Sequence, residues 1–432
     1  MEHKESSSKL AQTVSDYASQ CVKCALCLPH CPTYLLTKDE NESPRGRIAL
    51  FQALAQEKLP LSEKAQTHLD QCLGCRACER VCPAHVEYGQ LLTFGRTLLK
   101  QLPSKGPLPK TPFTTRFLSW IATKPSLLRA LHWLLWGLDK SGLRRLARFV
   151  KLPSLFGLSS LDNLLSGVSK PYHFQPHYAA IGTERGSVML FTGCISSLCD
   201  QETLAASIYV LRHLGMDVYI PSSQTCCGAI ASHAGDMAQA YHLAKQNNQA
   251  LMGITKKVDY VITTATGCSA VLQEYATHFS SDTNLEDATD LSSFSHKVMD
   301  IVTFIQHHEW PLSVIPKPLP LRVMLHTPCT RRNVLKSTAD PEQLLARIPE
   351  LTWKSFRSTQ CCGAAGTYML DHPDLAEPLA KQLLSELDDI QVDYIATSNI
   401  GCALHLQKQL KTRNPAITLG HPVILLARAL GF

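Results

Sequence analysis

Two cysteine runs near the N-terminus constrain this chain more than any other feature of its sequence. Each run has the spacing C-x2-C-x2-C-x3-C and is followed directly by a proline. In such a run the first three cysteines wrap one [4Fe–4S] cluster, and the next turn carries the fourth to the other cluster. The spacing therefore predicts two clusters that exchange their last ligands. The first would be held by Cys21, Cys24, Cys27 and Cys82, and the second by Cys72, Cys75, Cys78 and Cys31.

The alternative interpretation of these runs is two zinc sites with four cysteines each. Zinc motifs present separated C-x-x-C pairs, whereas both runs are triples followed by C-P, so the sequence favours iron. Clusters that share ligands lie close together and can pass electrons singly. No nucleophile–base pair accompanies them, so we predict an electron carrier with no catalytic residue. Arg45 and Arg47, in SPRGRI, either raise the potential of a nearby cluster or belong to a solvated helix start.

The seventeen cysteines are expected to be metal ligands rather than disulfides. The N-terminus shows no apolar signal-peptide core, and no apolar run reaches the length that spans a bilayer. Both observations favour a reducing, cytoplasmic environment, in which cysteines more often ligate metals. Hydrophobic residues make up 45% of the 432 residues, which is enough to bury substantial cores in two or three domains.

Residues 187–310 and 321–432 are predicted to be two copies of one unit. In each copy a cysteine lies 32 residues before a Cys-Cys-Gly turn, and another follows the turn after a similar interval. The flanks also match: GSVMLFTGC with LRVMLHTPC, and VDYVITTATGC with VDYIATSNIGC. The two sets are Cys194, Cys226, Cys227 and Cys268 in copy one, and Cys329, Cys361, Cys362 and Cys402 in copy two.

The flanks of these cysteines also indicate the fold class. Short β-branched runs (VMLF, DVYI, DYVITT, RVML, DYIAT) alternate with helical patterns such as QETLAASIYVLRHLG, which predicts parallel sheets with each cysteine beyond the carboxyl end of a strand. Adjacent cysteines rarely bridge each other without strain, so a Cys-Cys-Gly turn suits two ligands of one metal centre. We expect an α+β multidomain chain: a mostly helical dicluster ferredoxin-type domain over 1–98, a basic helical connector over 99–186, and two α/β cysteine-rich CCG repeats.

The connector carries most of the positive charge. Residues 101–170 hold 11 lysines and arginines against two aspartates, an excess of +9, whereas the rest of the chain sums to −3. Residues 126–138 predict a helix, and SGLRRLARFVK a second, basic amphipathic one. We expect the leucine stripe of the first helix to pack on the ferredoxin-type unit, and its Trp133, Trp136 and Arg129 face to dock on an anionic membrane or a partner subunit. No nucleic-acid motif accompanies the charge, so no nucleic-acid partner is expected. The stripe consists of Leu127, Leu131, Leu134, Leu135 and Leu138.

The paired units resemble the cysteine-rich CCG domains of heterodisulfide reductase subunits. Together with the N-terminal runs, the chain resembles the iron–sulfur subunit of glycolate oxidase (glycolate dehydrogenase). The matching motifs are SPRGRI at 43–48, HLDQCLGCRACERVCPAHVEYG at 68–89, TATGCSA at 264–270, CCGAAGTYMLDHPDLA at 361–376 and NIGCALHL at 399–406.

This resemblance implies a role in a hetero-oligomer. A separate FAD-binding subunit would oxidise glycolate to glyoxylate, and this chain would pass the electrons toward a membrane quinone while lying peripherally on the cytoplasmic face of the inner membrane. The sequence shows no G-x-G-x-x-G loop, in agreement with flavin on a partner. The alternatives are the iron–sulfur subunit of a lactate or anaerobic glycerol-3-phosphate dehydrogenase and, in other classes, a thiol–disulfide catalyst at the CCG centres or a cluster-loss sensor.

Both repeats depart from the heterodisulfide reductase pattern, which ends in C-x-x-C. The residues that follow Cys268 and Cys402 include no such cysteine, although His405 stands where copy two could recruit a substitute ligand. A further iron–sulfur cluster is therefore a hypothesis, with copy two the stronger candidate and copy one the weaker. The alternative for His405 is an ordinary helix histidine. Cys199 lies outside the pattern and is expected to be a small packed residue.

Overall fold

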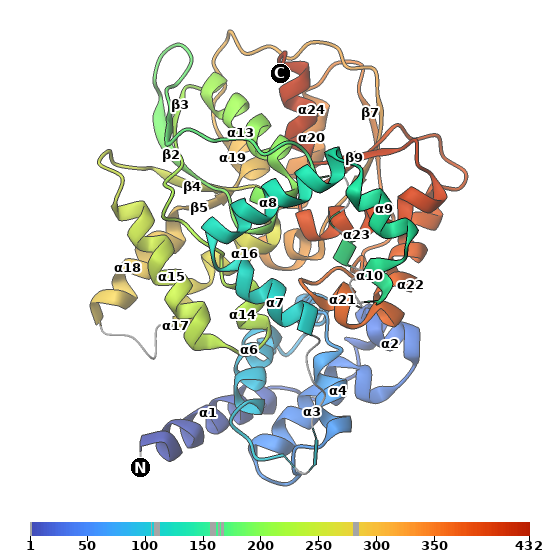
Figure 1. Ribbon diagram of the computed structural model, residues 1–432. Helices are drawn as coiled ribbons and strands as arrows, with labels where there is room; N and C mark the ends of the chain where they lie inside the picture. Colours follow the sequence, from blue (N-terminus) through green and yellow to red (C-terminus); the bar gives the residue numbers. More distant parts are fainter. Residues whose placement is uncertain are drawn as a thin grey trace.

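The computed structural model describes residues 2–104, 106–107, 113–155, 161–162, 165, 168–279 and 285–432. A small helical unit from the N-terminal part forms the foot of the molecule, and two sheets with their helices form the larger body above it (Figure 1). The connector helices run across the front of this body in the same view.

The N-terminal unit is built from helices. Ser43 begins α3, because its hydroxyl accepts a hydrogen bond from the amide of Gly46 and Pro44 occupies the first helical turn. Helices α1 and α6 pack against α3 around a core that includes Val14, Phe51 and other fully buried side chains. The helices are α1 (Glu2–Ser19), η1 (Leu28–His30), α2 (Pro32–Thr37), η2 (Glu40–Glu42), α3 (Pro44–Ala55), α4 (Glu63–Asp70), α5 (Ala77–Arg80) and α6 (Tyr88–Leu99).

The first repeat forms a sheet with the strand order β1-β3-β2-β4-β5. Strands β2 to β5 are parallel, and β1, which comes from the predicted connector, pairs antiparallel with β3. The strands are β1 (His177–Tyr178), β2 (Gly186–Phe191), β3 (Met216–Tyr219), β4 (Tyr260–Thr263) and β5 (Val298–Asp300). The helices are α12 (Ile195–Cys199), α13 (Gln201–His213), α14 (Ala229–His233), α15 (Met237–Met252), α16 (Thr266–Gln273), α17 (Tyr275–Phe279), α18 (Leu285–Lys297) and α19 (Ile301–His307).

The second repeat forms a parallel sheet with the order β7-β6-β8-β9, which matches β3-β2-β4-β5 strand for strand. The predicted α+β multidomain class and the duplication of an α/β unit are therefore confirmed. The strands are β6 (Arg322–His326), β7 (Thr352–Ser355), β8 (Tyr394–Thr397) and β9 (Thr418–Gly420). The helices are η3 (Arg331–Leu335), α20 (Asp340–Ala346), α21 (Tyr368–Asp371), α22 (Pro373–Leu384), η4 (Ser385–Leu387), α23 (Ile400–Arg413) and α24 (Pro422–Ala429).

The two repeats share one hydrophobic core. Val188 of β2 and Val323 of β6 belong to the same buried cluster, and α13 packs against α24 across it. A buried ion pair also joins them, since the Arg331 guanidinium contacts Asp300 and both side chains are almost fully enclosed. A common core makes the repeats one rigid body, which holds their cysteine sets in a fixed relation.

The described part of the connector contains helices between residues 113 and 155 and the short strand β1, but the leucines of its longest helix do not pack as predicted. Helices α7 (Phe113–Ala122) and α8 (Pro125–Lys140) cover the core of the first repeat, not the ferredoxin-type unit. Leu128 and His132 are the buried side chains of α8, whereas Leu127 and Leu134 of the expected stripe are exposed. Helical spacing identified a stripe of leucines. Which face of α8 is buried depends on the tertiary fold, and in the structure the buried face is the one that carries Leu128.

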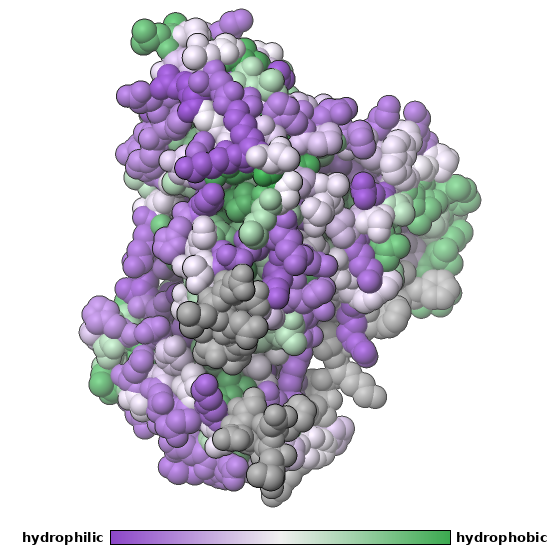
Figure 2. Space-filling view, turned by 90° about the vertical axis from the view of Figure 1, so that its left-hand side faces the viewer, coloured by the Kyte–Doolittle hydropathy of each residue, from purple (hydrophilic) through white to green (hydrophobic). Residues whose placement is uncertain are grey.

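The end of the connector presents apolar side chains to solvent. Helices α9 (Leu143–Phe149) and α10 (Leu152–Leu155) follow α8. Figure 2 shows apolar residues gathered along the right-hand edge of the molecule, the side on which α8 and α9 face the viewer in Figure 1. We call this surface the connector patch; it consists of Leu143 (54% exposed), Leu146 (58%), Phe149 (84%), Val150 (59%) and Leu155 (78%). Within the part of the chain that the structure describes, every helix falls short of the length and hydrophobicity that a membrane span requires.

Candidate iron–sulfur centres

The first cysteine run surrounds a cavity at the edge of the N-terminal unit. Cys21, Cys24 and Cys27 line it from the loop between α1 and η1, and Cys82 reaches it from the second run. Lys23 and Ala25 adopt positive φ values of 58° and 69°, which lets this loop curl around the cavity. Cys24 is exposed, so this cavity lies near the molecular surface.

The second run surrounds a neighbouring, deeper cavity. Cys72, Cys75 and Cys78 line it, together with Cys31 from the first run. The wall between the two cavities consists of residues that line both: Pro44, Cys78 and Tyr88. Cys78 lines both cavities, so five cysteines face the first cavity and four face the second. The ligand grouping expected from the spacing stays a prediction.

The sulfur atoms in the deeper cavity suit a positively charged cofactor. Burial raises the pKa of the Cys75 and Cys78 thiols well above the usual range, so without a cation beside them they would hold their protons. Tyr88 lies within 3.5 Å of the Cys72 sulfur through its hydroxyl, and Thr33 lies within 3.3 Å of the Cys31 sulfur. Iron bound by these cysteines would stabilise the thiolate form.

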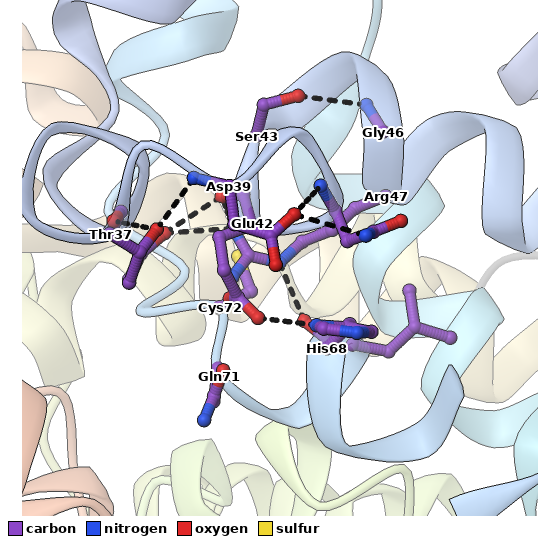
Figure 3. A network of polar contacts seen from close by, with 12 residues as sticks. Thr37, Asp39, Glu42, Ser43, Gly46, Arg47, His68, Gln71 and Cys72 are labelled. Atoms are coloured by element: carbon purple, nitrogen blue, oxygen red, sulfur yellow. Dashed lines mark hydrogen bonds and ion pairs between the residues drawn. The ribbon is translucent and has the colours of Figure 1, made fainter. Parts of the chain in front are cut away.

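A buried charge network supports the deeper cavity (Figure 3). Arg47 lines this cavity and is only 1% exposed. Its guanidinium pairs with the Glu42 carboxylate, which also contacts His68 Nδ1 at 2.6 Å, and its Nε donates to the His68 carbonyl at 2.7 Å. Burial alone would lower the pKa of Arg47, but the facing groups raise it above the usual value. These groups are Cys72, Tyr88, Cys31 and Glu42.

The two arginines of SPRGRI therefore differ in environment. Arg47 is not part of a solvated helix start, because it is enclosed beside the second cysteine cavity. Arg45 is partly exposed, lines the first cavity and pairs with Glu40 at 2.5 Å. The second cavity is also lined by Arg76, which pairs with Glu79 and Glu274. The charge of each of these arginines is thus balanced by a carboxylate.

The cysteines of the two runs are distributed around the walls of the two cavities. Among the described residues, no three cysteine, histidine, aspartate or glutamate side chains converge closely enough to ligate one ion. A zinc site needs four ligands around a single point. Four cysteines spread around a cavity match a cofactor of several irons, in which each sulfur binds a different metal atom.

The cysteines of the second repeat lie against the deeper cavity. Cys329 and Cys361 place their sulfur atoms 3.8 Å apart, and Cys362 contacts both Cys361 and Cys402 through its thiol. Cys75 packs against the same hydrophobic cluster as these residues. The hydroxyl of Tyr368 also donates to the carbonyl of Gln71 at 3.1 Å. The four sulfur atoms of this repeat therefore form a third set next to the second cavity.

The first repeat holds an equivalent set. Cys194 and Cys226 have their sulfur atoms 3.5 Å apart, and Cys227 contacts Cys226 and Cys268. The buried side chain of Asn247 holds this turn, since its Oδ1 accepts from the Thr225 amide at 2.9 Å and its Nδ2 donates to the Cys226 carbonyl at 2.9 Å. Both Cys-Cys-Gly turns end in a glycine with positive φ, 85° at Gly228 and 91° at Gly363.

The two repeat sets are linked through the beginnings of α16 and α23. The Asn399 side chain contacts the Cys402 sulfur at 3.4 Å and accepts from the Gly267 amide at 3.4 Å, next to Cys268. The Thr266 amide also donates to the Ser398 carbonyl at 3.1 Å. The four sets of cysteines therefore form one series through the molecule: first cavity, second cavity, second repeat, first repeat.

His405 and Cys199, the two further residues singled out in the sequence, lie in packed environments. His405 is buried, and its Nε2 contacts the Ala376 carbonyl at 3.1 Å, a bond that accounts for the side chain without a metal. Burial raises the pKa of the Cys199 thiol to about 12, as expected for a packed cysteine.

Two polar residues near the cavities were not identified from the sequence: Tyr88, and Asn333, whose side-chain amide donates to the Cys75 carbonyl at 2.7 Å. Neither residue type is a metal ligand in these motifs. The one signal in the sequence was the position of Tyr88 shortly after the second cysteine run, and it applied to Tyr88 alone.

Known proteins share this arrangement. Residues 17–86 match the family model of the 4Fe-4S dicluster domain, and residues 188–273 and 323–407 each match that of the cysteine-rich domain. A probable glycolate oxidase iron-sulfur subunit of Bacillus subtilis is 31% identical over 90% of this chain and 88% of its own length. The glycolate oxidase iron-sulfur subunit of Escherichia coli is 32% identical over 91% of this chain and 90% of its own length. The chain belongs to this family.

Membership of the glycolate oxidase iron–sulfur subunit family confirms the resemblance seen in the sequence. The chain is therefore an iron–sulfur electron-transfer subunit of an oxidoreductase. More distant relatives include lactate utilization protein A of Geobacillus thermodenitrificans, which is 26% identical over 51% of this chain and 89% of its own length. That relationship extends over about half of the present chain.

Proposed function

We propose that this chain carries electrons from a flavin-bearing partner subunit, which oxidises glycolate to glyoxylate, to a membrane quinone. The observation that carries the proposal is the continuous series of cysteine sets, which begins near the surface at Cys24 and continues into both repeats. Such a series suits conduction. No described group beside it resembles a nucleophile and base poised for substrate chemistry, so oxidation of the acid belongs to the partner.

The cofactors in this proposal are two [4Fe–4S] clusters, with ligands grouped as the spacing predicts: Cys21, Cys24, Cys27 and Cys82 for the first, and Cys72, Cys75, Cys78 and Cys31 for the second. The second repeat is the candidate for a further cluster, because its four cysteines adjoin the second cavity. The first repeat has an equivalent set of four. His405 is not included as a ligand in the proposal, since its Nε2 already contacts a backbone carbonyl.

The partner subunit would approach the first cavity. Cys24 is exposed there, between Val22 (68% exposed) and Leu26 (56% exposed). Exposed apolar side chains beside a redox site favour a protein partner, because their burial stabilises the complex that brings donor and acceptor together. This edge would receive the electrons.

The connector patch would rest on a membrane. Its apolar side chains are accompanied by Lys140, Arg145, Arg148 and Lys151, which suit anionic head groups. The protein would then be peripheral on the cytoplasmic face of the inner membrane. A partner subunit that covers the patch instead would make lipid binding disappear in the assembled complex.

Purification of the assembled complex tests the function. We expect a flavoprotein to co-purify with this chain, and anaerobic addition of glycolate to bleach the cluster absorbance. Addition of lactate and of glycerol 3-phosphate in parallel separates the three candidate substrates. A variant with Cys72 and Cys75 both changed to serine is the matched control, which should retain the partner but lose the bleaching. Bleaching by lactate alone would replace glycolate with lactate, and activity on a disulfide without any flavoprotein would overturn the proposal.

A further inference from the structure

A cavity of about 290 Å³ lies between α8 and the cysteine end of the first repeat. Cys194 and Cys226 line its inner end. Trp133, Tyr172 and His173 line it as well, and all three side chains are exposed. Its volume is close to the lower end of the range for small-molecule sites, and its walls carry a mixture of aromatic and polar groups like that of such sites. The cavity therefore connects the last cysteine set of the series to solvent.

The buried polar groups of the wall satisfy one another. His132 donates through Nε2 to the Ser169 carbonyl at 2.9 Å, and Gln201 accepts from the Tyr172 amide at 2.7 Å. These bonds hold the wall in shape, so these side chains are not free to bind a ligand. By contrast, neither Arg129 nor His173 makes a side-chain hydrogen bond to any described residue, and both line the cavity.

The remaining wall suits a flat ring. Tyr172 and Phe174 place their ring centroids 4.8 Å apart, and Trp133 lies on α8 among the lining residues. Aromatic walls favour a planar ligand, and two unpartnered donors favour one that carries acceptor oxygens. Trp133 is 53% exposed, so this aromatic wall is open to solvent.

We propose that this cavity binds the head group of a membrane quinone, the electron acceptor of the proposed function, on which this inference rests. The ring lies against the aromatic side chains. One carbonyl oxygen accepts a hydrogen bond from Arg129, and the other accepts from His173. Bound there, the ring adjoins Cys194 and Cys226, the inner end of the cysteine series.

The chemistry of this acceptor balances with the proposed function. Each quinone takes up two electrons and two protons, and its two carbonyl groups become the hydroxyl groups of a quinol. The electrons come from the 2-hydroxy acid that the flavin-bearing partner oxidises, delivered one at a time. The protons come from water at the exposed mouth of the cavity, beside His173.

Equilibrium dialysis of the iron-loaded chain with a short-chain ubiquinone tests the site without any turnover. Arg129→Leu and His173→Leu change exposed side chains and should leave the iron content unchanged. Loss of one charged hydrogen bond should raise the Kd for the quinone about tenfold or more in Arg129→Leu. Arg357→Leu is the matched control, because it removes an exposed arginine from the second repeat. Its Kd should equal that of the wild type.

An azido-quinone supplies a second measurement. Light-driven cross-linking should label peptides that contain residues 125–133 or 171–176, and unlabelled quinone should suppress the labelling. Labelling confined to other peptides, or equal affinity in Arg129→Leu and wild type, would overturn the assignment. Displacement of the quinone by glycolate would make the cavity a carboxylate site and would also overturn it. Quinone binding in a complex that does not oxidise glycolate would refute the proposed function alone, whereas quinone reduction with no labelling here would refute the cavity alone.

Discussion

Asn333 of the second repeat donates a hydrogen bond from its side-chain amide to the backbone carbonyl of Cys75 at 2.7 Å, although 258 positions separate the two residues. The same amide group accepts from Arg80 Nε at 3.0 Å through its oxygen. One side chain thus ties both ends of the loop that carries Cys75 and Cys78 to the π-helical turn after Cys329. This contact links the ferredoxin-type unit directly to the second repeat, as does the Tyr368–Gln71 hydrogen bond.

The first prediction concerns this link. Asn333→Ala leaves a carbonyl beside the second cavity without its donor, so we expect a loss of about 1–3 kcal/mol in the free energy of unfolding. The loop should also release iron faster under chelator challenge, while the first cavity is unaffected. Asn333→Asp keeps the shape and the contact to Arg80 but loses the donor. If both variants retain iron as well as the wild type, Asn333 has no positioning role.

The second prediction concerns the Arg47–Glu42 pair. Both side chains are almost fully buried, and removal of one partner leaves an uncompensated charge. Arg47→Met should therefore cost about 3–5 kcal/mol in the free energy of unfolding. The double variant Arg47→Met/Glu42→Gln should recover a large part of this loss. Chemical denaturation with matched iron loading measures both, and additive losses in the double variant would contradict the pairing.

Some strands of the two sheets could be predicted from the sequence, and others could not. Runs such as VMLF and DYIAT identified β2 and β8, because strands buried on both faces read as short, nearly continuous apolar runs. Strands β5 and β9 were not identified because each has only three residues, and β7 was not identified because its sequence, TWKS, has no buried residue and little apolar character. Strand β1 has only two residues and depends on β3 for its conformation.

In the candidate site, the metal-ligating residues could be predicted from the sequence, because cysteines at regular spacing are recognisable by themselves. Regular spacing identified the eight cysteines of the two cavities, and duplication identified the repeat sets. The polar support around them was not predictable. Asn333 and Cys75 meet only because the two units dock, and no local pattern reports a contact between residues so far apart in sequence. The same limit explains the misplaced leucine stripe of α8, whose partner surface comes from the first repeat.

The third prediction separates two neighbouring arginines of the connector. Arg144 is buried and contacts Asp162 at 2.6 Å and Asp139 at 3.0 Å, so Arg144→Glu should unfold the connector. Arg145 is exposed on the connector patch, and its charge reversal should weaken binding to anionic liposomes without loss of structure. A cationic side chain near an anionic surface contributes about 1 kcal/mol, so reversal predicts a decrease of about tenfold or more.

Flotation of the iron-loaded chain with liposomes checks the third prediction. Phe149→Ser, at a side chain that is 84% exposed, should weaken binding through lost apolar contact instead. Neutral liposomes should abolish the difference between wild type and Arg145→Glu. Equal flotation of all three proteins on anionic liposomes would remove the membrane from the proposed function.

The fourth prediction concerns acid stability and His421. Its Nδ1 accepts a hydrogen bond from the Val423 amide at 3.1 Å and caps α24, while its Nε2 is buried with no partner among the described residues. Burial, with a contribution from the charge of Arg331, lowers the pKa of His421 from 6.5 to about 3. The folded protein therefore excludes a proton that the unfolded chain accepts near pH 6.5.

Because of this difference in pKa, the free energy of unfolding decreases as the pH falls. The contribution of His421 to stability is complete above about pH 6.5 and is lost progressively as the pH falls toward 3, by at most about 1.4 kcal/mol per pH unit. His421→Asn keeps an acceptor for the cap but cannot be protonated, so its free energy of unfolding should depend less on pH between about 7 and 5. Denaturation of both proteins at equal iron content isolates this effect, because cluster lability is common to them.

His242→Asn, at an exposed position, is the control and should leave the pH dependence of the free energy of unfolding unchanged. Parallel pH profiles for His421→Asn and wild type would show that acid destabilisation arises elsewhere, with the buried His326 as the next group to change.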